Sequence, residues 1–407
     1  MLRRLALLLL VISVAACAGL PGAGGSAPRT VVLVSLDGFR PGDLGRGLTP
    51  TLDAMAREGV AAEGMRPSYP TLTFPNHYTL VTGLRPDRHG IVHNTIEDAT
   101  LGTFRNSDRD AVRDARWWGG EPLWSTAEKH GLPTATMFWP GSEAPIGGVY
   151  PGEYRAFDES VTAAARTDTV LGWLSRPAAE RPRFVTLYFE HLDEASHDAG
   201  PDSDAARAAI RILDAEIARL RSGIAARGLT DSVDLVIVSD HGMAEVAPDH
   251  VLAVEDIVPP DLARYVTTGQ SIGVAPLAGR DAEAMRAIVG RHAHHECWTR
   301  ETLPARWQFG RHPRVPPIVC QMDEGWDANT RKRIEERPRV HERGSHGYDP
   351  ALPSMAALFV ADGPSFRDGV RLPAFDNVHV YPLLARLLGI PPRPSDGDPA
   401  VLAPALR

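Results

Sequence analysis

The sequence predicts an α/β protein with a central, mostly parallel sheet that is covered by helices on both faces. Continuous apolar runs rich in β-branched residues are typical of strands buried on both faces. Five such runs occur: Thr30–Leu36, Thr134–Trp139, Phe184–Glu190, Val233–Ser239 and Ala356–Ala361. Helical patterns lie between them, at Thr49–Glu58 and at Asp204–Arg227. Strands that alternate with helices favour a parallel sheet between two helical layers.

The two helices have recognisable ends. The first begins at Thr49-Pro50, where proline is favoured because it needs no hydrogen-bonded N–H. The second carries apolar residues at helical spacing and stops before Gly228.

Composition excludes two broad classes of protein. Of the 407 residues, 43% are hydrophobic and 23% are charged, which is too apolar for a chain disordered throughout. The formal net charge of −8 gives no support for a groove that follows a nucleic-acid backbone. A large globular protein is therefore expected, and we expect a monomer.

The N-terminus predicts export. Arg3 and Arg4 precede an apolar run at Leu5–Ala16, which is shorter than the roughly 20 residues that a membrane-spanning helix needs. Residues 1–16 are therefore expected to be a signal peptide. The next residue, Cys17, follows Val-Ala-Ala as in the bacterial lipobox, so it is expected to carry lipid and to anchor a periplasmic protein to the outer membrane. The alternative is an ordinary signal peptide in which Cys17 is incidental.

The mature chain divides into a tether and one domain. Residues 17–29 are small and flexible and suit a tether. Residues 30–407 form the domain, with an insertion around 245–345 that is rich in proline, arginine and aromatic residues. The insertion holds Cys297 and Cys320, and an even pair in an oxidising compartment favours a disulfide over two separate thiols.

Carboxylates and histidines follow three of the predicted strands. Asp37 ends the first run, Asp193 lies just after the third with His197 four residues on, and Asp240-His241 ends the fourth. Side chains at the carboxyl ends of parallel strands converge. Each motif has a simpler interpretation when it is taken alone. Asp37 could belong to a turn, Asp193 could be a charge at a helix start with His197 as a solvated histidine, and Asp240-His241 could lie in a loop. Together they suit zinc or manganese, and His346, flanked by glycines, is a further candidate.

The segment around Thr73 supplies a candidate nucleophile. Pro75 is expected to be the first helical residue, which places Thr73 at a helix N-terminus. A simple cap is one interpretation of Thr73. The other is that the Phe74 amide and the helix dipole face an anion held at Thr73. A threonine hydroxyl attacks at neutral pH only when a metal or a base activates it.

These motifs, taken in order, carry a resemblance. Asp37, PTLTFPNH, GLRPDRHG, Asp193 with His197, DHGM and GSHG resemble a bacterial nucleotide pyrophosphatase/phosphodiesterase of the alkaline phosphatase superfamily. The resemblance covers roughly residues 30 to 392. It implies an alkaline-phosphatase-like fold and hydrolysis of nucleotide phosphodiester or pyrophosphate bonds, with release of nucleoside 5′-monophosphates.

The resemblance also implies a role for individual residues. One Zn²⁺ would be held beside Thr73 by Asp37, Asp240 and His241, and a second by Asp193, His197 and His346. Thr73 would be the nucleophile, and Asn94 would contact a phosphate oxygen. Phe74 and Phe157 would sandwich the nucleobase, with Leu123 in the same pocket. Ser196 departs from relatives that often carry glycine just before the histidine.

Other interpretations stay open. Phosphomonoester, sulfate-ester or choline-phosphodiester hydrolysis are alternatives within the superfamily. The Cys/Ser-x-Pro-x-Arg context that sulfatases need is replaced here by Thr-Phe-Pro-Asn-His. An exported, non-catalytic nucleotide-binding lipoprotein is an alternative of another class, and it predicts a missing ligand or nucleophile. The cluster from His292 to Glu296 is expected to be a solvated face rather than a metal site.

Overall fold

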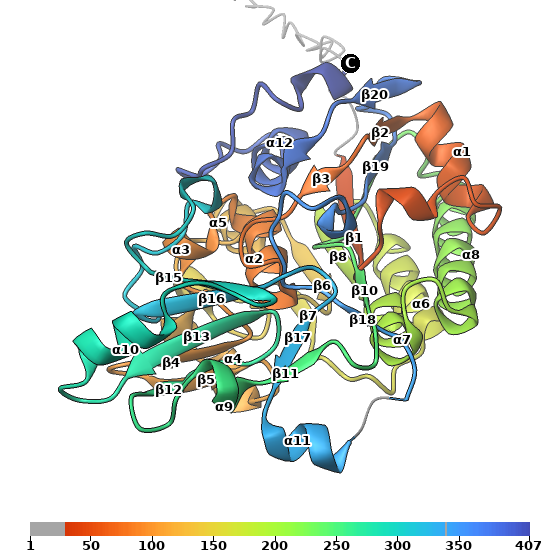
Figure 1. Cartoon of the computed structure of the whole chain (residues 1–407). Coiled ribbons are helices and arrows are strands. Elements are labelled where there is room, and N and C mark those ends of the chain that lie inside the picture. The colour runs from red at the N-terminus through yellow and green to blue at the C-terminus, as the bar shows by residue number, and fades with distance from the viewer. Residues whose placement is uncertain (1–28, 338–339) are drawn as a thin grey trace, which may run out of the picture.

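A computed structural model describes residues 29–337 and 340–407 (Figure 1). The predicted signal peptide, Cys17 and all of the tether except Arg29 lie outside the described residues. No helix in the described part of the chain is both long and apolar enough to cross a membrane.

The centre of the molecule is an eight-stranded sheet, which confirms the predicted α/β class. Its strands lie in the order β20 (Val370–Leu372), β2 (Val60–Ala62), β19 (Phe359–Asp362), β9 (Val233–Val238), β1 (Thr30–Leu36), β8 (Phe184–Phe189), β6 (Thr134–Met137) and β7 (Glu153–Arg155). Every residue of β1 is buried, because β8 and β9 flank it and helices cover its faces. The predicted apolar strands thus form the interior of the sheet.

Strand β19 is the one antiparallel member of this sheet. It runs opposite to β9 and to β2, whereas the other neighbouring pairs are parallel. Its first residue, Phe359, pairs with Val238, the last residue of β9. The chain therefore enters β19 from the carboxyl edge of the sheet, where the insertion returns. An apolar run predicts burial but carries no information on direction.

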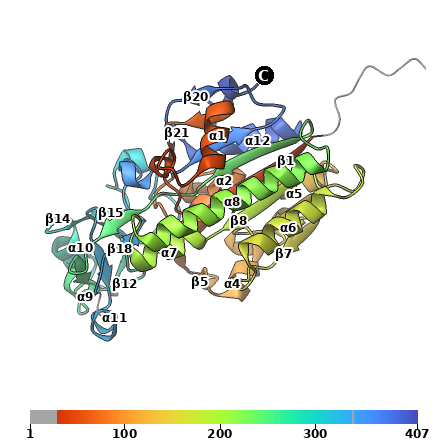
Figure 2. The same cartoon turned by 90° about the vertical axis from the view of Figure 1, so that its right-hand side faces the viewer.

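Two helical layers cover the sheet (Figure 2). One layer holds α1 (Pro50–Glu58), α6 (Ala163–Leu174), α7 (His191–Ala199) and α8 (Asp204–Ala226). The other holds α2 (Thr73–Thr82), α5 (Leu123–Lys129) and α12 (Val380–Leu388). Helix α8 buries Ile210, Leu213, Ile217 and Leu220, while Ile212 is 49% exposed because it lies on the outer side.

The chain between β9 and β19 builds a second, antiparallel sheet with its own apolar core at one end of the molecule (Figures 1 and 2). Its strands lie in the order β12 (Ala263–Tyr265), β13 (Ser271–Pro276), β16 (Ile318–Met322), β15 (His295–Thr299) and β14 (Gly290–His292). Cys297 and Cys320 face each other across β15 and β16 and form a disulfide, as predicted.

Short elements complete the fold. Paired strands are β3 (Met65–Arg66) with β21 (Phe375–Asp376), β4 (Thr95–Asp98) with β5 (Gly102–Arg105), β10 (Ala244–Val246) with β18 (Arg343–Ser345), and β11 (Val251–Ala253) with β17 (Asp327–Asn329). Short α-helices are α3 (Pro86–His89), α4 (Arg109–Arg113), α9 (Val254–Ile257), α10 (Asp281–Ile288) and α11 (Arg331–Glu336). The 3₁₀ turns are Pro41–Asp43, Ala115–Trp117, Ile146–Gly148, Ala305–Trp307, Pro353–Met355, Asn377–His379 and Ala403–Ala405.

Candidate metal centre

Two neighbouring strands each deliver a buried aspartate to the carboxyl edge of the central sheet. Asp37 directly follows β1, and Asp240 lies two residues after β9. The Gly38 amide is 3.4 Å from Asp240 Oδ1. Gly38 has φ of +72°, and a Cβ there would lie 3.3 Å from Asp193 Oδ1. Glycine therefore allows both the turn and the close approach of the third carboxylate.

His241 joins these aspartates beside the predicted nucleophile. Its Nε2 lies 2.9 Å from Asp240 Oδ2 and 3.5 Å from Asp37 Oδ1. The hydroxyl of Thr73 lies 3.4 Å from the same nitrogen. The structure thus brings together the four residues predicted for the first zinc site.

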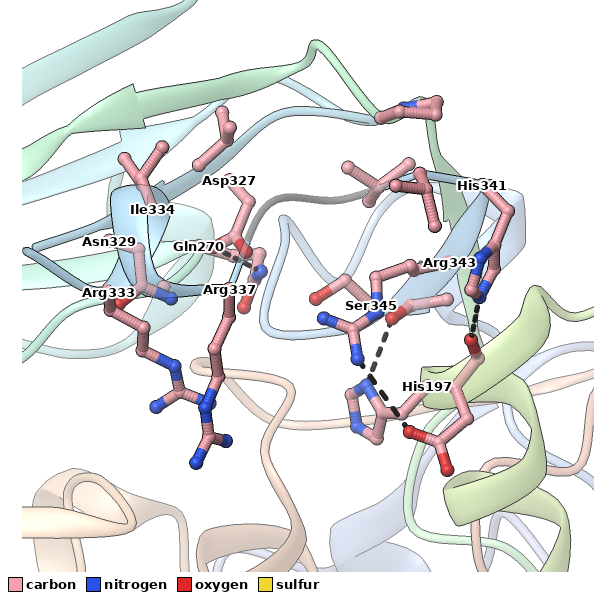
Figure 3. A pocket seen from close by; sticks show the side chains of 17 residues that line it. His197, Gln270, Asp327, Asn329, Arg333, Ile334, Arg337, His341, Arg343 and Ser345 are labelled. Atoms are coloured by element: carbon pink, nitrogen blue, oxygen red, sulfur yellow. Dashed lines mark hydrogen bonds and ion pairs between the residues drawn. The ribbon is translucent and has the colours of Figure 1, made fainter. Parts of the chain in front are cut away.

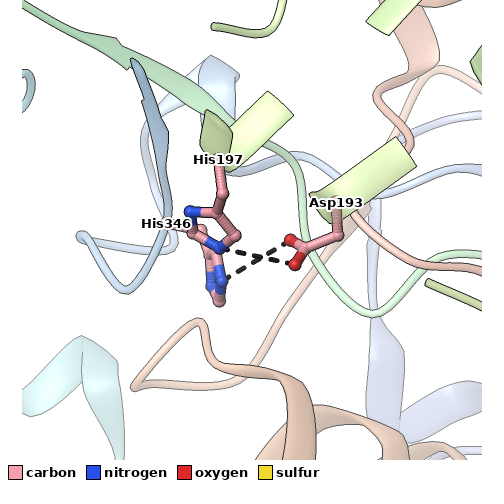
Figure 4. A group of neighbouring side chains, drawn as sticks. All are labelled: Asp193, His197 and His346. Carbon is pink, nitrogen blue, oxygen red and sulfur yellow. Dashed lines mark ion pairs between the residues drawn. The ribbon is translucent and has the colours of Figure 1, made fainter. Parts of the chain in front are cut away.

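The second predicted set also comes together (Figure 4). Asp193 and His197 lie one turn apart on α7, and His346 follows β18. Asp193 Oδ2 is 3.4 Å from His197 Nε2, and Asp193 Oδ1 is 3.6 Å from His346 Nε2. Ligand atoms of these three residues all lie within 4.8 Å of one another.

The three histidines are oriented by the backbone. Each donates its Nδ1 proton to a carbonyl oxygen 2.9 Å away: His197 to Gly344, His241 to Gly242 and His346 to Thr71. This directs each Nε2 toward the carboxylates, where its lone pair can bind a metal ion. Metal-ligating histidines are held in this way by outer hydrogen bonds.

The donor set fits divalent metal ions. Asp37 Oδ1, Asp193 Oδ1 and Asp240 Oδ2 are buried without a hydrogen-bond partner in the described part of the chain. Burial of unpartnered carboxylate oxygens is costly unless a cation neutralises them. Carboxylate oxygens together with neutral imidazole nitrogens are ligands that zinc accepts.

The electrostatics indicate the same need for a cation. Burial, and then the nearby Asp240 and Asp193, raise the pKa of Asp37 well above its usual range. Burial would also raise the pKa of Asp240, but His241 and His77 hold it well below its usual range. A cation between these carboxylates relieves their mutual repulsion.

His77 is a residue of the centre that sequence analysis did not single out. It is fully buried, and its Nδ1 lies 3.3 Å from Asp240 Oδ2 and 2.9 Å from the Thr73 carbonyl oxygen. Within residues 29–337 and 340–407, its group with Asp37 and Asp240 is one of three that could hold a metal. The signal was its place in Thr-Phe-Pro-Asn-His, four residues after Thr73 and therefore on the same helix face. No such group includes a residue of the cluster from His292 to Glu296.

Helix α2 begins at Thr73 itself, which corrects the predicted start at Pro75. Leu72 is the N-cap, and its carbonyl accepts the Asn76 amide at 3.1 Å. Pro75 is the third helical residue and is tolerated there because residues of the first turn need no hydrogen-bonded N–H. The Thr73 hydroxyl does not cap the helix and instead lies beside His241.

The groups predicted to hold the phosphate lie side by side. The Phe74 amide donates to Asn94 Oδ1 at 3.1 Å, so Asn94 engages the amide that was expected to face an anion. Both residues are partly exposed.

A cavity of about 900 Å³ opens beside the centre. Its lining includes Thr73, Asp37 and Asp193 together with Phe74 and Phe157, the two aromatic residues predicted to hold a nucleobase. The backbone amide of Phe157 donates to buried Glu143 at 3.1 Å, which fixes this wall.

Leu123 does not line this cavity, contrary to prediction. It is fully buried at the first turn of α5, packed into the main core. Asn106, Ser107 and Arg109, on and after the loop that follows β5, line the cavity instead. These polar positions have no periodicity from which the sequence could have predicted them.

Two further details complete the site. The Tyr188 hydroxyl donates to Asp37 Oδ2 at 2.7 Å and so orients a predicted ligand. Ser196 is buried within α7, and the helix continues through it to His197 without a break.

Comparison with known proteins shows which family this chain belongs to. The sequence model of the type I phosphodiesterase/nucleotide pyrophosphatase family matches residues 31–349. The chain belongs to this family. A pyrophosphatase/phosphodiesterase of Schizosaccharomyces pombe is 32% identical over 90% of this chain and 78% of its own length.

Other relatives of the family are longer than this chain. Bovine ectonucleotide pyrophosphatase/phosphodiesterase family member 3 is 35% identical over 90% of this chain but only 43% of its own length. A Crotalus durissus collilineatus venom phosphodiesterase is 34% identical over 90% of this chain and 45% of its own. The chain thus spans less than half of these two relatives. All three relatives are eukaryotic, so they support the family and not the bacterial group within it.

Solved structures of the family share the fold. Human ectonucleotide pyrophosphatase/phosphodiesterase 5 superposes with a TM-score of 0.87 at 30% identity, covering 93% of this chain and all of that chain. An inactive threonine-to-alanine variant of the murine protein, solved in complex with AMP, gives 0.87 at 29% identity.

Proposed function

We propose that this chain hydrolyses phosphodiester and pyrophosphate bonds of nucleotides and releases nucleoside 5′-monophosphates. The observation that carries the proposal is a single hydroxyl, Thr73, held between six Asp and His ligands and an aromatic-walled cavity. The relatives named as pyrophosphatases and phosphodiesterases support the reaction class. The murine relative supports a nucleotide ligand, since its threonine variant was solved with AMP.

The residues of the site have distinct roles in this reaction. Two Zn²⁺, held by Asp37, Thr73, Asp240 and His241 and by Asp193, His197 and His346, would supply Lewis-acid stabilisation of both the attacking and the leaving oxygen. Thr73 Oγ1 bonds to phosphorus and gives up its proton to solvent. The bond to the leaving group breaks, and its electron pair stays on the leaving-group oxygen.

The second half of the reaction restores the threonine. Water attacks the phosphoryl-threonine ester, releases the nucleoside monophosphate and returns the hydroxyl. During both halves, the side-chain N–H of Asn94 would donate to a non-bridging oxygen, where charge develops, and the Phe74 amide would donate to another after it leaves Asn94 Oδ1. Phe74 and Phe157 hold the base by stacking.

The site favours diesters over monoesters. A phosphate monoester near neutral pH is largely dianionic, whereas a diester carries one charge. Asn94 is a neutral donor and does not compensate a second charge. Asp158, Glu159 and Glu194, which line the cavity and are all exposed, repel it further.

The experiment compares two nitrophenyl substrates on zinc-loaded protein. The ester of thymidine 5′-monophosphate should exceed nitrophenyl phosphate by at least about 100-fold in kcat/KM, on the order of 2.7 kcal/mol. Equal efficiency on both substrates contradicts the proposal. Phe74→Ala and Phe157→Ala should narrow the advantage of nucleotides over base-free diesters such as glycerophosphocholine.

A threonine series tests the nucleophile in the same assay. Thr73→Ala should remove nearly all turnover while the fold and most of the zinc stay in place, because six other ligands remain. Thr73→Ser should keep part of the activity, since a hydroxyl remains. An alanine variant that turns over at close to the wild-type rate would show that another group attacks.

We further propose that the chain is exported and anchored through Cys17. The disulfide supports an oxidising compartment. Labelled fatty acid should enter the wild-type protein and not Cys17→Ala, and an unlabelled wild type refutes the anchor.

A further inference from the structure

A second cavity of about 690 Å³ opens beside the metal centre, and it shares no lining residue with the aromatic one (Figure 3). Thr73, Asp37 and Asp193 line the aromatic cavity, whereas His197, Gly344 and Ser345 line the second. The candidate ligands Asp193 and His197 lie one helical turn apart on α7, and each lines a different one of the two cavities, so both cavities reach the centre.

Arginines line the second cavity. Arg333 lies in α11 and Arg337 directly after it, four positions apart and therefore on one face, while Arg343 comes from β18 on the other side (Figure 3). Within residues 29–337 and 340–407, neither Arg333 nor Arg337 forms an ion pair with a carboxylate.

The acidic residues of this cavity are already engaged. Asp198 lies 3.7 Å from Arg343. Asp327 accepts the side-chain amide of Gln270 at 2.9 Å and its neighbour's backbone amide, that of Ala328, at 2.8 Å. Arg333 and Arg337 are thus left available for an anion from outside.

The aromatic cavity has the opposite character. Asp158, Glu159 and Glu194 line it in addition to the candidate ligands, and its one arginine, Arg109, is paired with buried Glu143. A negatively charged group added to the nucleoside is therefore unfavourable in the aromatic cavity, whereas an anionic group is favourable in the arginine-lined cavity. This difference in charge between the two cavities can orient a substrate, with its nucleoside in the aromatic cavity and its anionic leaving group in the arginine-lined cavity.

We propose that Arg333 and Arg337 form a subsite for leaving groups that carry additional phosphate. The inference rests on the proposed function and assigns its substrate class: nucleotides whose leaving group is pyrophosphate or a longer phosphate chain. Attacking and leaving oxygens lie roughly in line in phosphoryl transfer, so the leaving group departs on the side away from Thr73. His197 belongs to the second predicted zinc set, not to the one that lies beside Thr73, and it lines the arginine-lined cavity.

The test compares a phosphate leaving group with a phosphate-free one. ATP releases pyrophosphate, whereas the nitrophenyl ester of thymidine 5′-monophosphate releases nitrophenolate. In the double variant Arg333→Gln/Arg337→Gln, kcat/KM for ATP should fall about tenfold relative to that for the ester, because two charge-assisted contacts are lost. The matched control is Lys332→Gln on the same helix, whose side chain is 80% exposed and does not line the cavity.

A binding measurement decides the matter independently of turnover. In zinc-loaded Thr73→Ala protein, the double arginine change should weaken ATP binding about tenfold and leave binding of the nitrophenyl ester unchanged. A change of less than twofold in the affinity for ATP overturns the subsite. Failure of the wild type to cleave either substrate would instead contradict the proposed function, and the binding result would still decide the subsite.

Discussion

Hydrogen bonds to the ring nitrogens decide what each buried histidine can do. His197, His241 and His346 donate Nδ1–H to carbonyl oxygens and present Nε2 to the centre. His89 has the opposite arrangement: its Nδ1 accepts the Ile91 amide at 3.2 Å, and its Nε2 lies 3.1 Å from the Thr79 hydroxyl. Protonation of His89 at Nδ1 would place the new N–H against the N–H of Ile91, so the surroundings favour the neutral imidazole.

His89 should therefore make the fold sensitive to acid. Burial lowers its pKa to about 3, below the ordinary value near 6.5. A lowered pKa means that the stabilisation is fully present above pH 6.5 and is lost as the pH falls toward 3, by about 1.4 kcal/mol per pH unit for one proton. His89→Gln should remove this contribution, so the free-energy gap to wild type should narrow by about 2 kcal/mol between pH 6.5 and pH 5.

Urea unfolding of both proteins in chelator, at several pH values, measures this gap. Because the chelator removes metal from both proteins at every pH, loss of metal in acid does not contribute to the measured difference. A gap that stays constant from pH 7.5 to pH 5 would show that His89 titrates normally.

At the scale of residues, sequence predicted the ligands better than the surroundings. Asp37, Asp193 and Asp240 were predictable because strand ends converge whatever the details of packing. The contacts of His77 and Tyr188 with the aspartates were not, because they depend on which side chains tertiary packing brings alongside. The misplacement of Leu123 has the same origin, since an apolar residue at a helix start fits a core as well as a pocket.

At the scale of elements, the second sheet is fastened both within itself and to the main domain. Within it, the disulfide joins β15 and β16 across one residue pair. Against the main domain, Arg314 donates to Asp98 Oδ2 at 2.8 Å and to the Gly90 and Trp117 carbonyl oxygens. The prolines and paired cysteines of this region indicated an insertion, but its sheet order depends on pairings that short, irregular strands do not encode.

Loss of the disulfide should destabilise the second sheet. The bond closes a loop across a sequence separation of 23, for which chain entropy predicts about 3 kcal/mol. Cys297→Ala/Cys320→Ala should lower the unfolding free energy by roughly this amount and leave the metal ligands in place. Urea unfolding measures the loss.

The matched control for the disulfide is wild-type protein reduced under native conditions. It should approach the double variant, because both lack the covalent link while the surrounding strands are unchanged. Intact-mass analysis that finds two free thiols in exported wild-type protein would contradict the bond itself.

At the scale of the whole molecule, the metal centre is built from parts of the chain that are far apart in sequence. Its residues come from β1, α2, α7, the end of β9 and the return of the insertion, over the span from Asp37 to His346. Sequence order places these segments far apart, and the parallel sheet brings them to one edge. Alternation of strands and helices was enough to predict that edge, whereas the direction of β19 followed only from the path of the insertion.

Zinc should therefore contribute to the stability of the whole domain. Three buried carboxylate oxygens have no partner in the described chain, and their repulsion must be overcome on folding without a cation. Ligands that bind only the native state stabilise it by about 2.7 kcal/mol per site at a free concentration of 100 Kd. Two occupied sites, together about 5.4 kcal/mol, should thus raise Tm by about 7 °C over chelator-treated protein, given roughly 1.3 °C per kcal/mol for a domain of this size.

Metal analysis and calorimetry on the same samples test this prediction. Wild-type protein should hold two zinc ions, and His197→Ala should lose one of them with about half of the chelator-dependent shift in Tm, because His197 belongs only to the group with Asp193 and His346. Thr73→Ala serves as the matched control and should keep most of the zinc and of the shift, since it removes a hydroxyl and no charge. Fewer than one zinc ion per active chain, or a Tm that chelation does not change, would show that the buried carboxylates are stabilised in another way.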